Sequence, residues 1–180
     1  NVTVYGDNFG LGGSVVFIGG TRCSSVFHDS MYQHSKLVCV FVGGNGGSGK
    51  HVKVVQAGLV NTIKTAGLFT FVAPSVYSAT NVDTAGGLVI IGGSSFGLRD
   101  ASISVGNTRC FPVFHDESMP HQRLYCLLQE GIGTNLSVGV TQEGLSSGFV
   151  ASLFSYSTPV IDGISSVSTK GGTVTIVGRS

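Results

Sequence analysis

Apolar and polar side chains alternate with a period of two along most of this chain, and helical periodicity is almost absent. Such alternation predicts half-buried β-strands, and the glycine-rich breaks between the runs predict turns. In the first part of the chain, the runs predict strands at Val2–Tyr5, Ser14–Ile18, Leu37–Val42, Val52–Val55 and Leu68–Val72. In the second part, they predict strands at Leu88–Ile91, Ser102–Val105, Arg123–Leu128, Leu136–Val140 and Ala151–Tyr156. Two further extended pieces each follow a proline, Val76–Ser78 after Pro74 and Val160–Ile164 after Pro159.

The two sets of strands belong to a duplication. Thr21-Arg22-Cys23 returns as Thr108-Arg109-Cys110, at an offset of 87 residues. Pro74 and Pro159 correspond at an offset of 85. The smaller offset indicates short deletions in the loops between the matching strands of the second copy. The repeat therefore predicts two tandem domains with one fold.

A third copy begins near the end of the chain. Residues 84–92, TAGGLVIIG, are echoed by residues 169–178, TKGGTVTIVG, and Val2–Gly6 is the same segment again. We therefore expect domain 1 at residues 1–73, lacking its first strand, domain 2 at residues 74–158, and the start of domain 3 at residues 159–180. Because an isolated pair of strands is only marginally stable in water, we expect the natural protein to extend in both directions.

The number and length of the strands indicate the fold class. About seven short strands per copy with glycine-rich turns are typical of an immunoglobulin-like sandwich. We therefore expect an all-β protein, with two tandem β-sandwiches and the first strands of a third. The chain has no tryptophan, so an antibody-type core is excluded, and the expected core aromatic residues are Phe9, Phe69, Phe96 and Phe154.

The four cysteines lie at corresponding places in the two copies, and the two in each copy are 16 residues apart. Because each domain must close alone, the duplication favours the disulfides Cys23–Cys39 and Cys110–Cys126 among the three possible connectivities. Disulfides indicate an oxidising, extracellular setting. Two alternatives stay open: buried free thiols, and a zinc site, for which the cysteines alone do not provide four ligands at short spacing.

Two sequons for N-linked glycosylation agree with an extracellular setting. Asn135-Leu136-Ser137 follows a glycine-rich segment that predicts an exposed hairpin tip, and Asn1-Val2-Thr3 opens the chain. We expect glycan at Asn135 and also at Asn1.

Charge and hydropathy exclude two classes of partner. Charged residues make up only 11% of the chain and the formal net charge is +1, with no cluster of Lys and Arg. Nucleic-acid binding depends on such clusters to neutralise phosphates, so we expect no nucleic-acid partner. The longest apolar run, Leu37–Val42, has six residues, far fewer than the about 18 of a membrane span.

A glycine-rich segment and two histidine pairs are the candidates for chemistry. Gly44–Lys50 fits G-x-G-x-x-G and nearly fits a P-loop, but both motifs need a following helix, and an alternating strand follows here. We interpret this segment as a hairpin loop. His28 and His34 lie six residues apart, and His115 and His121 repeat this spacing. They are either a metal site or a polar connection copied by duplication, and we favour the connection.

Catalysis has no candidate in this sequence. No Ser/His/Asp arrangement and no pair of carboxylates stands out among the nine acidic residues. We therefore expect no enzymatic activity, no catalytic or metal-binding residue and no cofactor.

The motifs of both copies resemble the IPT/TIG domain, and the resemblance covers essentially the whole chain. Residues 86–97, GGLVIIGGSSFG, carry it best, together with Cys110, Cys126 and residues 154–159, FSYSTP. The resemblance implies an early-set immunoglobulin-like fold and the paired cysteines of extracellular members such as plexins, fibrocystin-like proteins and the tiger proteins of social amoebae. Rel-type transcription factors share the fold, but their basic DNA-binding loops have no counterpart here. The family has no common activity, so the resemblance says more about fold than about function.

Together these features predict a non-enzymatic extracellular structural or adhesive protein, a repeating segment of a longer IPT/TIG array that builds a fibre, stalk or matrix. The expected partners are further copies or neighbouring chains, associated head to tail, and N-linked glycans. The alternative is the ectodomain of a cell-surface adhesion or recognition receptor. A third hypothesis is an accessory domain of a secreted carbohydrate-active enzyme.

Overall fold

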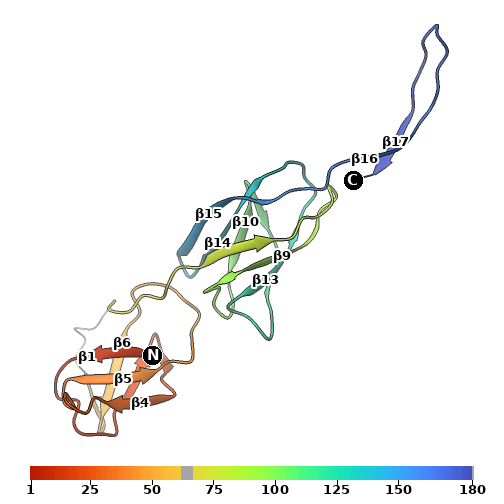
Figure 1. The fold of residues 1–180 in the computed structure, drawn as a ribbon. Helices are drawn as coiled ribbons and strands as arrows, with labels where there is room; N and C mark the ends of the chain where they lie inside the picture. The colour runs from red at the N-terminus through yellow and green to blue at the C-terminus, as the bar shows by residue number, and fades with distance from the viewer. Residues whose placement is uncertain (62–66, 180) are drawn as a thin grey trace. The chain divides into compact units, whose positions relative to one another are not determined.

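The computed structural model describes residues 1–61 and 67–179, and over these residues the protein is all-β (Figure 1). The predicted fold class, tandem immunoglobulin-like β-sandwiches, is confirmed. The chain divides into two compact units. Unit 1 comprises Asn1–Ala73 with Gln142–Leu145, and unit 2 comprises Pro74–Thr141 with Ser146–Ser180. No helix in the described part of the chain has the length and apolar character needed to cross a membrane.

The described residues of unit 1 form seven strands in two sheets. They are β1 (Val2–Tyr5), β2 (Val15–Ile18), β3 (Thr21–Arg22), β4 (Ser25–His28), β5 (Lys36–Val40), β6 (Val52–Gln56) and β7 (Leu59–Val60). One sheet has the order β1-β5-β4 and the other has the order β3-β2-β6-β7. The inward side chains of both sheets form one core: Phe9, Val16, Ile18, Cys23, Leu37, Cys39, Val52 and Val54.

The sandwich of unit 2 has the same plan with one strand more. Its strands are β8 (Ser75–Ala79), β9 (Gly87–Ser94), β10 (Ser102–Val105), β11 (Thr108–Cys110), β12 (Val113–His115), β13 (Arg123–Leu128), β14 (Leu136–Gln142) and β15 (Leu145–Phe154). The sheets have the orders β12-β13-β9-β8 and β11-β10-β14-β15. The core has fifteen buried residues, including Phe96, Phe154 and Tyr156.

The pairing registers show that the units are copies of one fold. Val2 pairs with Cys39 on β5, and its counterpart Val89 pairs with Cys126 on β13. The remaining pairs of β1 and β5 also recur between β9 and β13 at the offset of 87 residues. The strand without a counterpart is β8, which pairs with β9 at the outer edge of its sheet.

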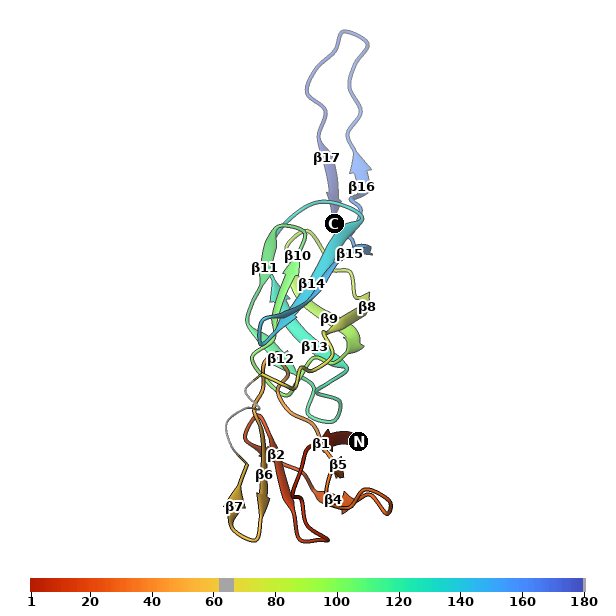
Figure 2. The same cartoon turned by 90° about the vertical axis from the view of Figure 1, so that its left-hand side faces the viewer.

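The end of the chain forms a separate two-stranded hairpin. Strands β16 (Val160–Ile164) and β17 (Ile176–Arg179) pair with each other, as Figure 2 shows in blue. All four residues of β17 and four of the five residues of β16 are exposed. Within the described part of the chain, the side chains of this hairpin are therefore largely in contact with water.

Several strand predictions need correction. The expected strand Leu68–Val72 does not form, and only Phe69 makes an isolated bridge, with Lys50. Its counterpart in unit 2 pairs through Tyr156 with Val82 of the first-strand segment, which unit 1 lacks among its described residues. Short strands that the alternation did not indicate are also present, namely β3, β4, β7, β11 and β12. They have two to four residues, too few for a period to be visible.

Candidate functional site: an open groove in unit 1

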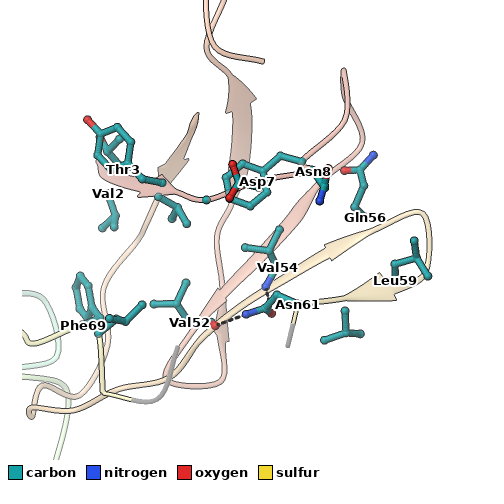
Figure 3. Close-up of a pocket in the computed structure, with 16 residues that line it drawn as sticks. Val2, Thr3, Asp7, Asn8, Val52, Val54, Gln56, Leu59, Asn61 and Phe69 are labelled. Carbon is teal, nitrogen blue, oxygen red and sulfur yellow. Dashed lines mark hydrogen bonds between the residues drawn. The ribbon is translucent and has the colours of Figure 1, made fainter. Parts of the chain in front are cut away.

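Unit 1 has an open groove between its two sheets, with a volume of about 770 Å³ (Figure 3). One wall is β1 and the loop after it, and the other is formed by β6, β7 and the segment around Phe69. In Figure 3 Val2 on the first wall and Val52 and Val54 on the second border the same space. Apolar side chains therefore line an opening that leads to the core.

The wall of the groove on β6 is fixed by a side chain. Asn61, just after β7, accepts a hydrogen bond from the backbone N–H of Val54 at 2.9 Å. Its amide nitrogen donates to the carbonyl of Val52 at 3.3 Å, and both bonds are drawn in Figure 3. In unit 2 Ser147 plays part of this role, because its hydroxyl accepts from the N–H of Val140 at 2.9 Å.

The groove exposes residues whose counterparts are fully buried. Val89 and Ile91 of β9 have no exposed surface, whereas Val2 and Val4 of β1 are half-buried. The same holds on the opposite wall, where Phe154 is 1% exposed but Phe69 is half-buried. Since the sequences at these positions are alike, the difference lies in what covers them.

In unit 2 the first-strand segment covers this place. Strand β8 pairs with β9, and its Val76 is 5% exposed within the core. Farther along, Val82 makes a parallel bridge with Tyr156 and packs against the core, so the segment seals both sheets. Among the described residues of unit 1, no strand pairs with the outer edge of β1. The groove therefore corresponds to the place that β8 and Val82 occupy in unit 2.

A glycine in β9 shows how closely the first strand approaches. A side-chain carbon at Gly93 would collide with the carbonyl oxygen of Ser75 on β8 and with the ring of Phe96. Gly178 on β17 meets the carbonyl oxygen of Val160 on β16 in the same way. Unit 1 has Gly6 at the corresponding position, where a side-chain carbon would meet only the ring of Phe9. The edge of β1 thus keeps the glycine that admits a neighbouring backbone.

The C-terminal hairpin is a second copy of the β8–β9 pair. Val76 pairs with Gly93 and Ser78 with Gly92, with a bulge between the two pairs. On the hairpin Ile161 pairs with Gly178 and Gly163 with Val177, with the same bulge. Both strands match at the offset of 85 residues, and so do the hydrogen bonds that close the pair. Thr80 N donates to Ile90 O at 3.0 Å, and Ser165 N donates to Thr175 O at 2.9 Å.

The paired histidines and aspartates form the same polar turn in each unit. His28 Nδ1 lies 2.9 Å from the carbonyl oxygen of Gln33, and His115 Nδ1 lies 3.1 Å from that of Pro120. His34 is exposed and His121 is half-buried. Over the described residues, no group of three or more His, Cys, Asp or Glu side chains could hold a metal ion.

Asp29 and Asp116, which directly follow His28 and His115, each stabilise a turn through their carboxylate groups. Asp116 accepts from the N–H groups of Ser118 and Met119, both at 2.9 Å, and from the hydroxyl of Tyr125 at 2.7 Å. These hydrogen bonds, that from Tyr125 first, hold the pKa of Asp116 well below its usual range. In unit 1 the hydrogen bond from Lys36, at 2.7 Å, lowers the pKa of Asp29.

The four cysteines are joined within the units in the structure. Cys23 is bonded to Cys39 and Cys110 to Cys126, with Cα–Cα distances of 5.8 and 5.6 Å. Each bond links the two sheets of its own sandwich. Cys39 lies on β5 and Cys126 on β13, whereas Cys23 and Cys110 lie at the opposite sheet of the same unit. All four are buried, so the bonds belong to the cores.

The other predicted positions lie on the surface. Asn135 is exposed just before β14, with a φ of 55°, and its N–H donates to the hydroxyl of Ser155 at 3.0 Å. Asn1 is exposed before β1. The glycine-rich segment Gly44–Lys50 leads into strand β6 and not into a helix, so it lacks the amide cluster of a phosphate-binding loop.

Sequence reasoning inferred the missing strand but not the groove that it leaves. The walls contributed by Leu59, Val60 and Asn61 gave no signal, because β7 is too short to show alternation. The alternation of Val52 and Val54 was the available sign that β6 turns one face inward.

No known protein-family model matches this chain, and no curated protein matches it. Solved structures do. The surface glycan-binding protein PbSGBP-B from Prevotella bryantii matches with a TM-score of 0.54 at 18% identity, over 86% of this chain and 36% of that chain. The full extracellular region of plexin A4 matches with a TM-score of 0.43 at 18% identity, over 90% of this chain and 14% of that chain. The SGBP-B of a Bacteroides ovatus mixed-linkage glucan utilisation locus, in complex with a heptasaccharide, gives 0.36 at 13% identity, over 94% and 46%.

These likenesses concern the fold. The chain spans less than half the length of each of the three proteins. At 18% identity, the match to PbSGBP-B shows the fold alone.

Proposed function

We propose that this protein is a non-enzymatic extracellular structural protein whose IPT/TIG-type domains associate head to tail into a fibre, stalk or matrix. The observation that carries the proposal is the repetition of one sandwich plan along the chain. Strands β1 and β5 pair in the register of β9 and β13, and the hairpin β16–β17 repeats the pair β8–β9.

The assignment of the domains to the IPT/TIG type rests on residues with a structural role. Gly93 and Phe96 of the glycine-rich motif lie where the first strand contacts the core, and the paired cysteines link the sheets. The disulfides, and sequons on exposed residues, support an extracellular place. We assign Cys23–Cys39 and Cys110–Cys126 as the native pairs, and Asn135 and Asn1 as glycan sites.

An exposed strand edge beside an apolar opening is a liability that natural proteins cover. A contact between two different surfaces of one chain generates a ring if the rotation closes and a filament if it does not. Repetition of one sandwich along the chain favours a structural role over the alternative, a receptor ectodomain that acts as a monomer.

The test is the state of association of the 180-residue chain, secreted from a host with an oxidising secretory pathway. We expect the average mass in light scattering to rise with concentration, and negative-stain microscopy to show filaments. A chain that stays monomeric at all concentrations would favour the receptor ectodomain and end the fibre proposal.

A further inference from the structure

We infer that Lys50 and Asn45 of unit 1 join through an isopeptide bond between their side chains, with Glu143 carrying the protons. All three residues belong to unit 1, because the segment Gln142–Leu145 is part of it. Asn45 and Lys50 flank the run Gly-Gly-Ser-Gly at residues 46–49. This site plays no part in the proposed head-to-tail association.

The carboxylate of Glu143 contacts both of the groups that would react. One of its oxygens, Oε1, accepts a hydrogen bond from the amide nitrogen of Asn45 at 2.9 Å. The other, Oε2, lies 3.7 Å from the amine nitrogen of Lys50. The structure therefore gathers a nucleophile, an amide and a proton carrier, with the carboxylate in contact with the nitrogen that would leave.

The side chain of Lys50 is held in place by bare backbone. Its own N–H donates to the carbonyl of Phe69 at 2.8 Å, in an isolated bridge. A side-chain carbon at Gly19 would lie 3.3 Å from the Lys50 stem. One at Gly47 would collide with Cε and Nζ of Lys50, at 2.8 and 2.9 Å. Gly47 also has a φ of 93°, a conformation that favours glycine. The backbone thus packs against the amine and keeps it at Glu143.

Asn45 is fixed by two consecutive residues. Gln142, which is 1% exposed, donates from Nε2 to the backbone carbonyl of Asn45 at 2.6 Å. The next residue, Glu143, accepts from the side-chain amide of the same asparagine. The orientation of the amide therefore does not depend on the glycines that follow it. Such positioning matters because an amide is a weak electrophile, and holding reactants in place can supply much of the rate.

Unit 2 shows that the position of Lys50 does not need an amine for packing. Its counterpart, at an offset of 86 residues, is Leu136. Each of the two side chains lies beside a corresponding pair of glycines. These glycines are Gly19 and Gly47 in unit 1, and Gly106 and Gly133 in unit 2. Since an aliphatic side chain fills this place in unit 2, the feature that distinguishes Lys50 is the amine that reaches Glu143.

The reaction exchanges one amide for another. The neutral amine of Lys50 attacks the side-chain carbonyl carbon of Asn45, a new C–N bond forms, and the bond from that carbon to Nδ2 breaks. Two protons pass from the ammonium group of Lys50 to the leaving nitrogen, which departs as ammonium. Glu143 accepts each proton from the amine and gives it to Nδ2, and ends as the carboxylate that it was. No oxidant or reductant is consumed.

The product is a covalent ring across residues 45–50, in the connection between β5 and β6. Glycine loses more conformational freedom on ordering than any other residue, and three of the four residues inside the ring are glycines. A bond that closes the ring removes part of this freedom from the unfolded chain. It would therefore stabilise the glycine-rich connection.

The test is a tryptic peptide map of the full chain, secreted from a host with an oxidising secretory pathway and reduced before mass spectrometry. Trypsin should not cleave after Lys50, because its amine is acylated. We expect the peptide Leu37–Lys53 to be recovered whole, with a mass lower than that of its sequence by one ammonia. Fragmentation should give no backbone fragments from inside the ring.

Three variants assign the roles. Lys50→Arg keeps the positive charge but lacks the nucleophilic amine, so the ammonia should be retained and trypsin should cleave at position 50. Glu143→Gln keeps the size of the side chain but cannot carry protons, and should also abolish the loss of ammonia. Lys53→Arg, on β6 and outside this cluster, is the matched control and should keep it. Formation of the disulfide Cys23–Cys39 shows that each variant is folded.

Four outcomes overturn the inference or part of it. A peptide of unchanged mass, cleaved after Lys50, shows that no bond forms. A loss of ammonia that survives Lys50→Arg marks attack on Asn45 by the backbone nitrogen of Gly46. A mass raised by conversion of the amide to an acid marks hydrolysis of Asn45. A loss that survives Glu143→Gln removes Glu143 from the proton transfer. The state of association is measured separately, so each of these outcomes leaves the fibre proposal as it stands.

Discussion

The sharpest consequence of the open groove is that one substitution has unequal effects in the two units. Val89 and Val2 are counterparts on β9 and β1, pairing with Cys126 and Cys39 in the same register. Val89 has no exposed surface, whereas Val2 is half-buried and borders the groove. Replacing each by alanine therefore probes what covers it.

Val89→Ala should cost about 2 to 3 kcal/mol, because it loses roughly 0.8 kcal/mol for each carbon removed from the core and leaves a cavity. Val2→Ala should cost less than about 1 kcal/mol, because its methyl groups already contact water and an open groove leaves no cavity. The lower strand propensity of alanine affects both variants and cancels in the comparison.

Hydrogen exchange read by mass spectrometry measures this difference, because peptides report on each unit separately. The samples must be dilute enough that light scattering gives the mass of a monomer. A Val2→Ala variant as destabilised as Val89→Ala in that monomer would show that something covers β1, and the groove would not be open.

Three further predictions concern unit 2. Non-reducing peptide mapping should link Cys110 to Cys126, and replacing both by alanine should lower the free energy of unfolding by roughly 3 kcal/mol in urea titrations. Native material should carry glycan at Asn135, seen as conversion to aspartate after enzymatic release, and a bare asparagine there would contradict the assignment. Hydrogen bonds, the largest effect being that of Tyr125, lower the pKa of Asp116 in the folded protein. The ionised Asp116 therefore stabilises the fold fully above its unfolded pKa of about 3.9. This stabilisation is lost as the pH falls through the lower pKa of the folded state. Tyr125→Phe should therefore be more destabilising at pH 7 than in strong acid, and an equal effect at both would refute the role.

The sequence predicted those strands whose inward residues follow a clear alternation. Ser102–Val105 and Arg123–Leu128 form with the expected bounds, because Ile103, Val105 and Leu124 alternate with polar or exposed residues over four or more positions. The three-residue strand Val113–His115 was not predicted, because it can be recognised only through its pairing with β13. Long-range pairing is what a local pattern cannot contain.

The sequence predicted the difference between the two copies that underlies the candidate site, but it did not predict the shape of the groove. The repeat indicated that the first copy holds no counterpart of Val76–Ser78, which is matched by Val160–Ile164. The sequence did not indicate that unit 1 folds into two sheets around an open groove. Nor did it indicate that Leu68–Val72 would contain no strand, with an isolated bridge at Phe69.

The two free edges of the corresponding sheets differ in a way that supports a partner at β1. In unit 2 the edge strand β8 carries a bulge between Val76 and Ser78, a device that protects an edge from further pairing. Strand β1 has none of the usual protections: its four residues include no charge and no proline, and its register with β5 is regular. An edge that is regular, uncharged and bordered by an apolar groove is suited to receive a strand, whereas β8 is suited to end the sheet.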